Sequence, residues 1–203
     1  MGGIYRIKPR FQQALSGIAG ALTVCHVHPD MLTAAAFAVA LAGGGALVAG
    51  RWVPALLLLV PGLALARTAL NALDGMVARA AGLARPWGEV LNELGDRLAD
   101  VAFFAGVALA PGSSPALGSA VLVAMLLCSY LGTAARAAGG RRQYGGIMGK
   151  ADRMIYLGGA AVLAFLLPGV PVFTGFLTIV LAGLGLTILS RLRATYADLQ
   201  SAS

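Results

Sequence analysis

Six long apolar segments fill most of this chain and leave little room for any other structure. Pro, Gly or basic residues separate them, and they lie at about 31–50, 53–78, 88–110, 115–138, 151–168 and 171–190. A helix needs roughly 20 apolar residues to cross a hydrocarbon layer of about 30 Å. The chain has 203 residues, 11% of them charged, and a mean hydropathy of +0.83. These features exclude an ordinary soluble domain and predict an all-α integral membrane protein with six transmembrane helices, in a single domain over residues 1–203.

A shorter amphipathic segment precedes the apolar ones. Phe11, Leu15, Ile18 and Leu22 follow Pro9 at spacings of three and four residues. This pattern places them on one face of a helix over about residues 9–24. Such an N-terminal amphipathic helix is expected to lie in the membrane interface.

The basic residues indicate an orientation in the membrane. If the N-terminus is cytoplasmic, all but three of the 15 lysines and arginines fall at cytoplasmic helix ends. The exceptions are Arg51 on the outer side and Arg67 and Arg97 within helices, where each is expected to have an acidic or backbone partner. The pattern predicts a multi-pass protein of the bacterial inner membrane with both termini cytoplasmic. It also assigns the net charge of +7 to contact with anionic membrane lipids and not to nucleic acid.

Five acidic residues interrupt two of the apolar segments: Asp74, Glu89, Glu93, Asp96 and Asp100. An acid at the centre of a lipid-facing helix costs about 2.5–3.5 kcal/mol, so these side chains must face the protein interior. At 100° per residue, Asn92 shares one helix face with the last four acids. Asn71 and Asp74 are three residues apart and share a face of the preceding helix. We therefore expect two polar faces to meet at the cytoplasmic side.

Clustered oxygen ligands without a nearby Cys or His suit one or two Mg²⁺ or Mn²⁺ ions better than zinc. Such an ion commonly completes its coordination with substrate phosphates, which indicates phosphoryl or phosphatidyl transfer. Acids within a membrane also occur on ion pathways, so an ion or proton transporter is the alternative class.

The residues from Asn71 to Asp96 resemble the signature of the CDP-alcohol phosphotransferase family. The chain reads Asn71-Ala-Leu-Asp74-Gly75-Met-Val-Ala78-Arg79, followed by Gly88, Asn92 and Asp96. Every spacing of the signature D-x2-D-G-x2-A-R-x8-G-x3-D-x3-D is kept. Asn replaces Asp at the first and third aspartates, so the chain looks like a variant subgroup of the family.

The resemblance implies a transmembrane transferase of phospholipid biosynthesis, usually a homodimer. Such an enzyme cleaves the pyrophosphate of a CDP-linked donor, here a CDP-diacylglycerol-like lipid, and passes the phosphatidyl group to an acceptor hydroxyl. By position, Asn71, Asp74, Asn92 and Asp96 would be the metal ligands, and Asp96 the catalytic base. The positions expected to contact CDP are Gly75, Ala78, Arg79, Gly88 and, in the first span, Thr33.

The two asparagines lower the charge of the four-position site from −4 to −2. Glu93, Glu89 and Asp100 are possible extra acids on the same face that would restore charge, and a single ion helped by Arg79 is the other possibility. A catalytically weak or inactive CDP-lipid-binding homologue is therefore the alternative to an active phosphatidyltransferase.

A basic loop precedes the fifth apolar segment. It contains Arg136, Arg141, Arg142, Lys150 and Arg153, with a glycine-rich stretch between. Exposed backbone amides and forked cationic donors would bind a phosphate, although a loop on the cytoplasmic side is basic in any case. The acceptor is expected to be a small alcohol or a polyol phosphate, and a loop that binds phosphate favours the polyol phosphate.

Overall fold

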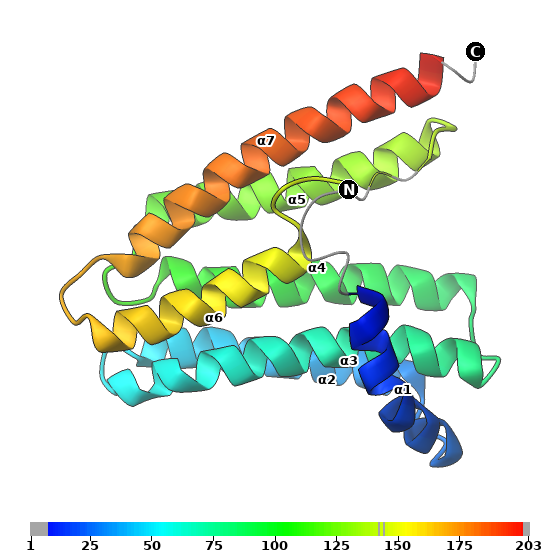
Figure 1. The fold of residues 1–203 in the computed structure, drawn as a ribbon, viewed down its shortest axis with the longest axis horizontal. Helices are drawn as coiled ribbons and strands as arrows, with labels where there is room; N and C mark the ends of the chain where they lie inside the picture. Colours follow the sequence, from blue (N-terminus) through cyan, green and yellow to red (C-terminus); the bar gives the residue numbers. More distant parts are fainter. Residues whose placement is uncertain (1–7, 142, 144, 201–203) are drawn as a thin grey trace.

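The structure is a computed structural model that describes residues 8–141, 143 and 145–200. Its described part is entirely helical, with no strand, which confirms the all-α prediction. In chain order the helices are α1 (Lys8–Val24), α2 (Pro29–Ala49), the 3₁₀ helix η2 (Pro54–Leu59), α3 (Val60–Ala80), α4 (Pro86–Ala108), α5 (Pro115–Ala137), α6 (Lys150–Leu166) and α7 (Val172–Gln200) (Figure 1).

Helix starts and turns follow the local sequence. Three helices, α2, α4 and α5, begin at a proline, whose fixed φ and missing N–H suit the first helical position. Gly82 and Gly112, in the turns after α3 and α4, have a φ of 67°, a backbone conformation that glycine adopts without steric cost. From α2 to α7 the chain reverses between successive α-helices, with η2 continuing directly into α3, so the starts of α2, α4 and α6 lie at the same end of the bundle as the ends of α3, α5 and α7 (Figure 1). We call this the polar end.

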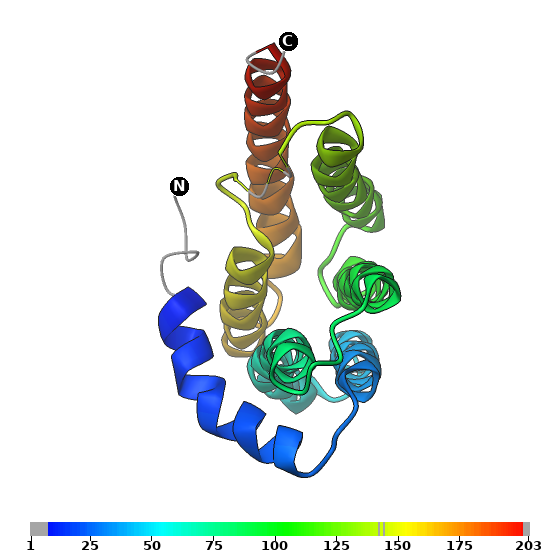
Figure 2. The same cartoon turned by 90° about the vertical axis from the view of Figure 1, so that its right-hand side faces the viewer.

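The bundle consists of two groups of helices around one apolar core. Helix α2 packs against α3 and α4, α3 packs against α6, and α5 packs against α7. Phe103, Phe104, Leu157, Phe173 and Leu184 are buried where these helices meet. Helices α5 and α7 lean away from the others toward the polar end (Figures 1 and 2). The two groups meet where α4 packs against α5 and α6 packs against α7.

Two glycines bring α2 and α4 into close contact. A Cβ added to Gly44 would overlap the backbone carbonyl of Ala102, and one added to Gly106 would overlap the backbone of Gly44. Such close approach of backbones is how membrane helices gain packing energy. The contact fixes α4, which carries four of the eight acidic residues, against α2.

Helix α1 lies outside the bundle and crosses α3 at the polar end (Figure 2). Leu15 and Ala19 are its buried residues, and they pack with Leu32 of α2 and with Leu73 and Val77 of α3. The amphipathic helix expected over residues 9–24 is thus present, and its place in the membrane interface stays a prediction.

Within the described part of the chain, four helical segments are long and apolar enough to cross a membrane, namely Pro29–Ala49, Pro54–Ala80, Pro115–Ala137 and Val172–Gln200. Helix α4 carries five charged residues and α6 has only 17 residues, so the count of six spans is not confirmed. The last helix differs most from expectation, because it continues ten residues past the predicted end at 190. Its 29 residues correspond to about 43 Å, longer than a hydrocarbon layer of about 30 Å.

Candidate functional site

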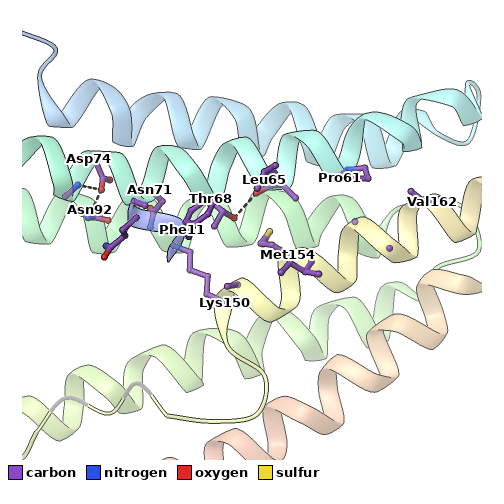
Figure 3. Close-up of a pocket in the computed structure, with 18 of the residues that line it drawn as sticks. Phe11, Pro61, Leu65, Thr68, Asn71, Asp74, Asn92, Lys150, Met154 and Val162 are labelled. Atoms are coloured by element: carbon purple, nitrogen blue, oxygen red, sulfur yellow. Dashed lines mark hydrogen bonds between the residues drawn. The ribbon is translucent and has the colours of Figure 1, made fainter. Parts of the chain in front are cut away.

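A cavity of about 910 Å³ opens at the polar end, between α3, α4 and α6. Its polar lining includes Asn71, Asp74, Arg79, Asn92 and Lys150 (Figure 3). The expected meeting of two polar faces therefore takes place, with α3 supplying one face and α4 the other.

Asp74 is held in place by three hydrogen bonds. Its Oδ2 accepts from the hydroxyl of Thr33 on α2 at 3.0 Å, and its Oδ1 accepts from the backbone N–H of Gly75 at 2.5 Å. The side-chain amide of Asn92 on α4 donates to the same Oδ1 at 3.4 Å. Asp74 is only 2% exposed, so these donors orient the carboxylate that the sequence motif singles out.

Asp96 forms an ion pair with Lys150, the first residue of α6. Arg67 of α3 donates to the backbone carbonyl of Asp96 at 3.2 Å, and one of its guanidinium nitrogens lies 3.9 Å from the Asp96 carboxylate. The side chains of Asp96 and Lys150 are 15% and 24% exposed, and Lys150 lines the cavity whereas Asp96, also described, is not among the lining residues. Asp96, the candidate base, is thus joined by an ion pair to a lysine of the basic loop.

Asp100 lies one turn deeper, between two arginines. Arg67 is 2.6 Å from one of its carboxylate oxygens and Arg153 is 3.2 Å from the other. All three side chains are buried, and the two arginines balance the charge of Asp100 and leave one positive charge over. Asp100 therefore contributes to a buried ion-pair network that joins α3, α4 and α6.

The two arginines predicted to lie within helices have the expected partners. Arg67 pairs with Asp100, and Arg97 pairs with Glu93 four residues earlier and approaches Asp100 at 3.8 Å. This prediction is confirmed. The arrangement also occupies Glu93 and Asp100, two of the three acids considered as sources of extra charge. The third, Glu89, is exposed in the first turn of α4 and is not among the lining residues.

The basic loop does not gather around the cavity as a group. Only Lys150 lines it, whereas Arg136 is exposed at the end of α5 and Arg141 pairs with Asp198 of α7. Arg153 is buried against Asp100 and the carbonyl of Met148, and Arg142 lies outside the described residues. The described arginines of this loop therefore do not form a phosphate site together.

Helix α7 holds the basic loop, a role that the sequence patterns did not reveal. The hydroxyl of Thr187 accepts from the backbone N–H of Ile147 and of Met148, at 3.2 and 3.1 Å. Arg191 donates to the carbonyls of Gly145 and Cys128, at 2.9 and 2.5 Å. The available signal was the spacing of four residues between Thr187 and Arg191, which puts both on one face of an otherwise apolar helix.

The expected CDP contacts divide into two sets. Gly75 and Arg79 line the cavity, and Thr33 lies against Asp74. Ala78 and Gly88, both described, are not among the lining residues. The cavity thus includes only part of the CDP-binding motif.

An apolar groove between α3 and α6 extends the cavity away from the polar end. It is lined on α3 by Pro61, Ala64 and Leu65, and on α6 by Met154, Ile155, Gly158, Gly159, Val162 and Leu163. The labelled residues in Figure 3 run from Asp74 and Asn92 at one end, past Lys150, to Pro61 and Val162 at the other. Pro61 and Asp74 are 13 residues apart on one helix, which corresponds to about 20 Å. The sequence pattern does not reveal this groove, because a membrane helix has the same small and apolar residues whether it faces lipid, protein or a ligand.

The donor set fits one divalent cation and not two. Asp74 and Asp96 supply two negative charges, and Asn71 and Asn92 can add only neutral oxygens. Among the residues that the structure describes, no three His, Cys, Asp or Glu side chains are grouped to hold a metal ion. Two carboxylates balance one Mg²⁺ or Mn²⁺, and Asp100, four residues after Asp96 on α4, is already neutralised by arginine.

Comparison with known proteins gives a relative and a shared fold. No family model matches the chain. The chain is 37% identical over 155 residues to the inner membrane protein YnbA of Escherichia coli, and the match covers 76% of this chain and 77% of that protein.

Two solved structures of Mycobacterium tuberculosis phosphatidylinositol phosphate synthase (PgsA1) have the same architecture. One, with CDP-DAG bound, superposes with a TM-score of 0.74 at 23% identity and covers 91% of this chain and 94% of that one. The other, in complex with manganese and citrate, gives a TM-score of 0.73 at 24% identity and covers 89% and 88%. The chain thus has the fold of a CDP-alcohol phosphotransferase and belongs to the family of the Escherichia coli inner membrane protein YnbA.

Proposed function

We propose that the protein is a membrane-embedded CDP-alcohol phosphatidyltransferase of phospholipid biosynthesis. It would take the phosphatidyl group of a CDP-diacylglycerol-like donor, pass it to the hydroxyl of a small alcohol or a polyol phosphate, and release CMP.

The continuity of the cavity carries this proposal. One end holds the polar residues of the motif, and the other end is an apolar groove of about 20 Å between α3 and α6. A volume of about 910 Å³ lies at the upper end of the range for ligand sites. Only an amphipathic ligand with an anionic head and an apolar chain matches both ends.

The shared fold supports the choice of donor. The mycobacterial synthase with the same architecture has CDP-DAG bound in one structure and manganese in another. In the present chain, Gly75 and Arg79 lie at the cavity where the head group would dock. A Cβ on Gly75 would lie 3.3 Å from a guanidinium nitrogen of Arg79, so the glycine leaves this arginine room to fold over a phosphate.

Asp96 is the proposed base. Its carboxylate would accept the proton of the acceptor hydroxyl, and the resulting oxygen would attack the phosphorus that bears the diacylglycerol. The bond between that phosphorus and the bridging oxygen of the diphosphate would break, and CMP would leave with the electron pair. Lys150 contacts Asp96 and would hold its carboxylate in position.

The metal ligands are proposed to be Asn71, Asp74, Asn92 and Asp96. A divalent ion bound there would neutralise the diphosphate and stabilise the charge of the leaving group. Thr33 and Gly75, which both donate to Asp74, would keep its carboxylate oriented toward the ion.

A CDP-lipid-binding homologue without turnover is the second candidate. Two observations favour it: the amides at Asn71 and Asn92 reduce the charge available to a metal, and Lys150 already occupies Asp96. This homologue would bind CDP-diacylglycerol at the same cavity and form no CMP.

The deciding experiment uses purified full-length protein with radiolabelled CDP-diacylglycerol, Mn²⁺ and a panel of polyols and polyol phosphates. CMP and a new lipid are the expected products, and Asp74→Ala or Asp96→Ala should abolish both while the protein stays folded. Asp30→Asn is the matched control, because Asp30 pairs with Arg85 and is not among the lining residues. Full activity in both alanine variants would rule out the mechanism, and ion flux in proteoliposomes without CMP would indicate a transporter.

The homodimer, the cytoplasmic position of the site and of both termini, and the identity of the acceptor stay predictions from the sequence.

A further inference from the structure

We propose that this site works with one divalent ion and that the ammonium group of Lys150 is the second positive charge that holds the donor diphosphate. The inference deepens the proposed function and rests on it. It assigns Lys150 to the diphosphate of the donor, whereas the sequence pattern assigned this lysine to the phosphate of the acceptor.

The charges at the polar end support a single ion. Asp74 and Asp96 are the two acids of the four-position motif, and Asn71 and Asn92 bring no charge. Lys150 also pairs with Asp96, so one divalent ion together with this ammonium already exceeds the two negative charges of Asp74 and Asp96. A second divalent ion would add two positive charges where no carboxylate is left to balance them.

Lys150 is placed where such an ion would otherwise be needed. Its ammonium contacts the carboxylate of Asp96 and lines the same cavity as Asn71, Asp74 and Asn92. An ammonium group has three donors, so two remain for phosphate oxygens after one is given to Asp96. The lysine therefore bridges the proposed base and the bound anion, as a shared metal ion would.

The protein holds the backbone at Lys150 firmly. It is the first residue of α6, and the carboxylate of Asp152 accepts a hydrogen bond from the preceding Gly149 N–H at 2.9 Å. The N–H of Met148, two residues before Lys150, donates to the hydroxyl of Thr187 on α7. The partial positive charge of the α6 N-terminus adds to that of the ammonium.

No other described cation fits this role as well. Arg67 and Arg153 are buried against Asp100, and Arg141 pairs with Asp198 outside the cavity. Arg79 lines the cavity but is exposed at the end of α3, beside Gly75.

The first measurement is Mn²⁺ binding in the presence of CDP, counted by electron paramagnetic resonance of the free ion in detergent-solubilised protein. The wild type should bind one Mn²⁺ per chain. The variant N71D/N92D/K150Q, which restores four aspartates and removes the lysine, should bind two. Two ions bound by the wild type, or one by the triple variant, would overturn the inference.

The second measurement is the affinity for CDP at saturating Mn²⁺ with no acceptor present. Lys150→Gln should weaken it about tenfold or more, the usual effect of losing hydrogen bonds from a charged group to phosphate, and Lys150→Arg should restore part of it. Arg51→Gln, which removes a cation at the far end of the bundle, should leave it unchanged. Unchanged CDP affinity in Lys150→Gln, with a raised KM for the acceptor alone, would assign the lysine to the acceptor instead.

These binding results are independent of turnover. One Mn²⁺ and Lys150-dependent CDP affinity in a protein that forms no CMP would support the inference and refute the proposed activity. CMP formation by a protein that binds two ions would refute the inference and support the proposed activity.

Discussion

Asn92 on α4 donates from its side-chain amide to Oδ1 of Asp74 on α3, at 3.4 Å. The family signature has an aspartate at this position, and an aspartate would face Asp74 with a second negative charge. Two carboxylates in contact would need a cation between them, whereas the amide of Asn92 and the carboxylate of Asp74 form a hydrogen bond without one. The two helices can therefore hold the site together before any ion or substrate arrives.

Asn92→Asp should make the stability of the protein depend on divalent ions. With EDTA the new carboxylate repels Asp74, and the lost hydrogen bond and added repulsion should cost about 2 kcal/mol, or about 5 °C in Tm for a chain of this size. Mn²⁺ should recover this loss. Thermal unfolding in detergent, with and without Mn²⁺, measures both effects. Asn92→Ala is the control, because it removes the hydrogen bond without adding charge and should gain little from Mn²⁺; identical behaviour of the two variants would contradict the prediction.

Asp100→Asn should destabilise the fold strongly. Arg67 and Arg153 are both buried against this carboxylate, and removing the shared partner of a buried ion pair costs about 3–5 kcal/mol. We expect Tm to fall by about 10 °C. Asp30→Asn breaks the ion pair with Arg85, in which both side chains are partly exposed, and should change Tm by less than about 3 °C. Comparable losses in the two variants would show that the buried network is not a main source of stability.

Thr187→Val should impair the site without unfolding the protein. The change removes the acceptor for the N–H groups of Ile147 and Met148, so the loop before Lys150 loses its anchor on α7. We expect CDP affinity to fall about tenfold, and Thr187→Ser to restore it. Thr178→Val is a matched control on the same helix, because that hydroxyl is exposed and bonds only to the carbonyl of Thr174. Equal CDP affinity in the Thr187 and Thr178 variants would argue against the anchoring role.

Gly159→Leu should block the apolar groove and leave the head-group site intact. Gly159 lines the cavity, and a Cβ added there meets no atom within 4 Å, so a larger side chain would project into the groove. The KM for a CDP-diacylglycerol with long acyl chains should rise about tenfold or more, while CDP itself binds as before. Gly175→Leu adds the same side chain to open space on α7, away from the cavity. A long-chain KM that does not change in Gly159→Leu would place the lipid chains elsewhere.

The sequence predicted the parts of the site that lie close together along the chain. The motif spacing puts Asn71 with Asp74 on α3 and Asn92 with Asp96 on α4, and helix periodicity is enough to turn each pair toward the other. The buried partners of Arg67 and Arg97 were predictable in kind, because an unpaired cation in a membrane helix is costly.

The remaining features depend on contacts between distant segments. Lys150 meets Asp96 across 54 positions of sequence, and Thr187 meets Met148 across 39. No local pattern separates Lys150, which lines the cavity, from Arg153, which is buried three residues later on the same helix. The tilt of α5 and α7 decides which loop residues reach the site, and this tilt follows from packing that a single sequence does not display.

Helix α7 makes the loop before Lys150 sensitive to the bilayer itself. The apolar part of this helix, over 172–190, corresponds to about 28 Å and so matches a hydrocarbon layer of about 30 Å, and in a thinner bilayer such a helix would tilt. Because Thr187 and Arg191 fasten the loop to this helix, a change in tilt carries the loop with it and shifts the start of α6 relative to α4. The length of the lipid chains, which sets the thickness of the bilayer, would therefore affect how Lys150 and Asp96 are placed relative to each other.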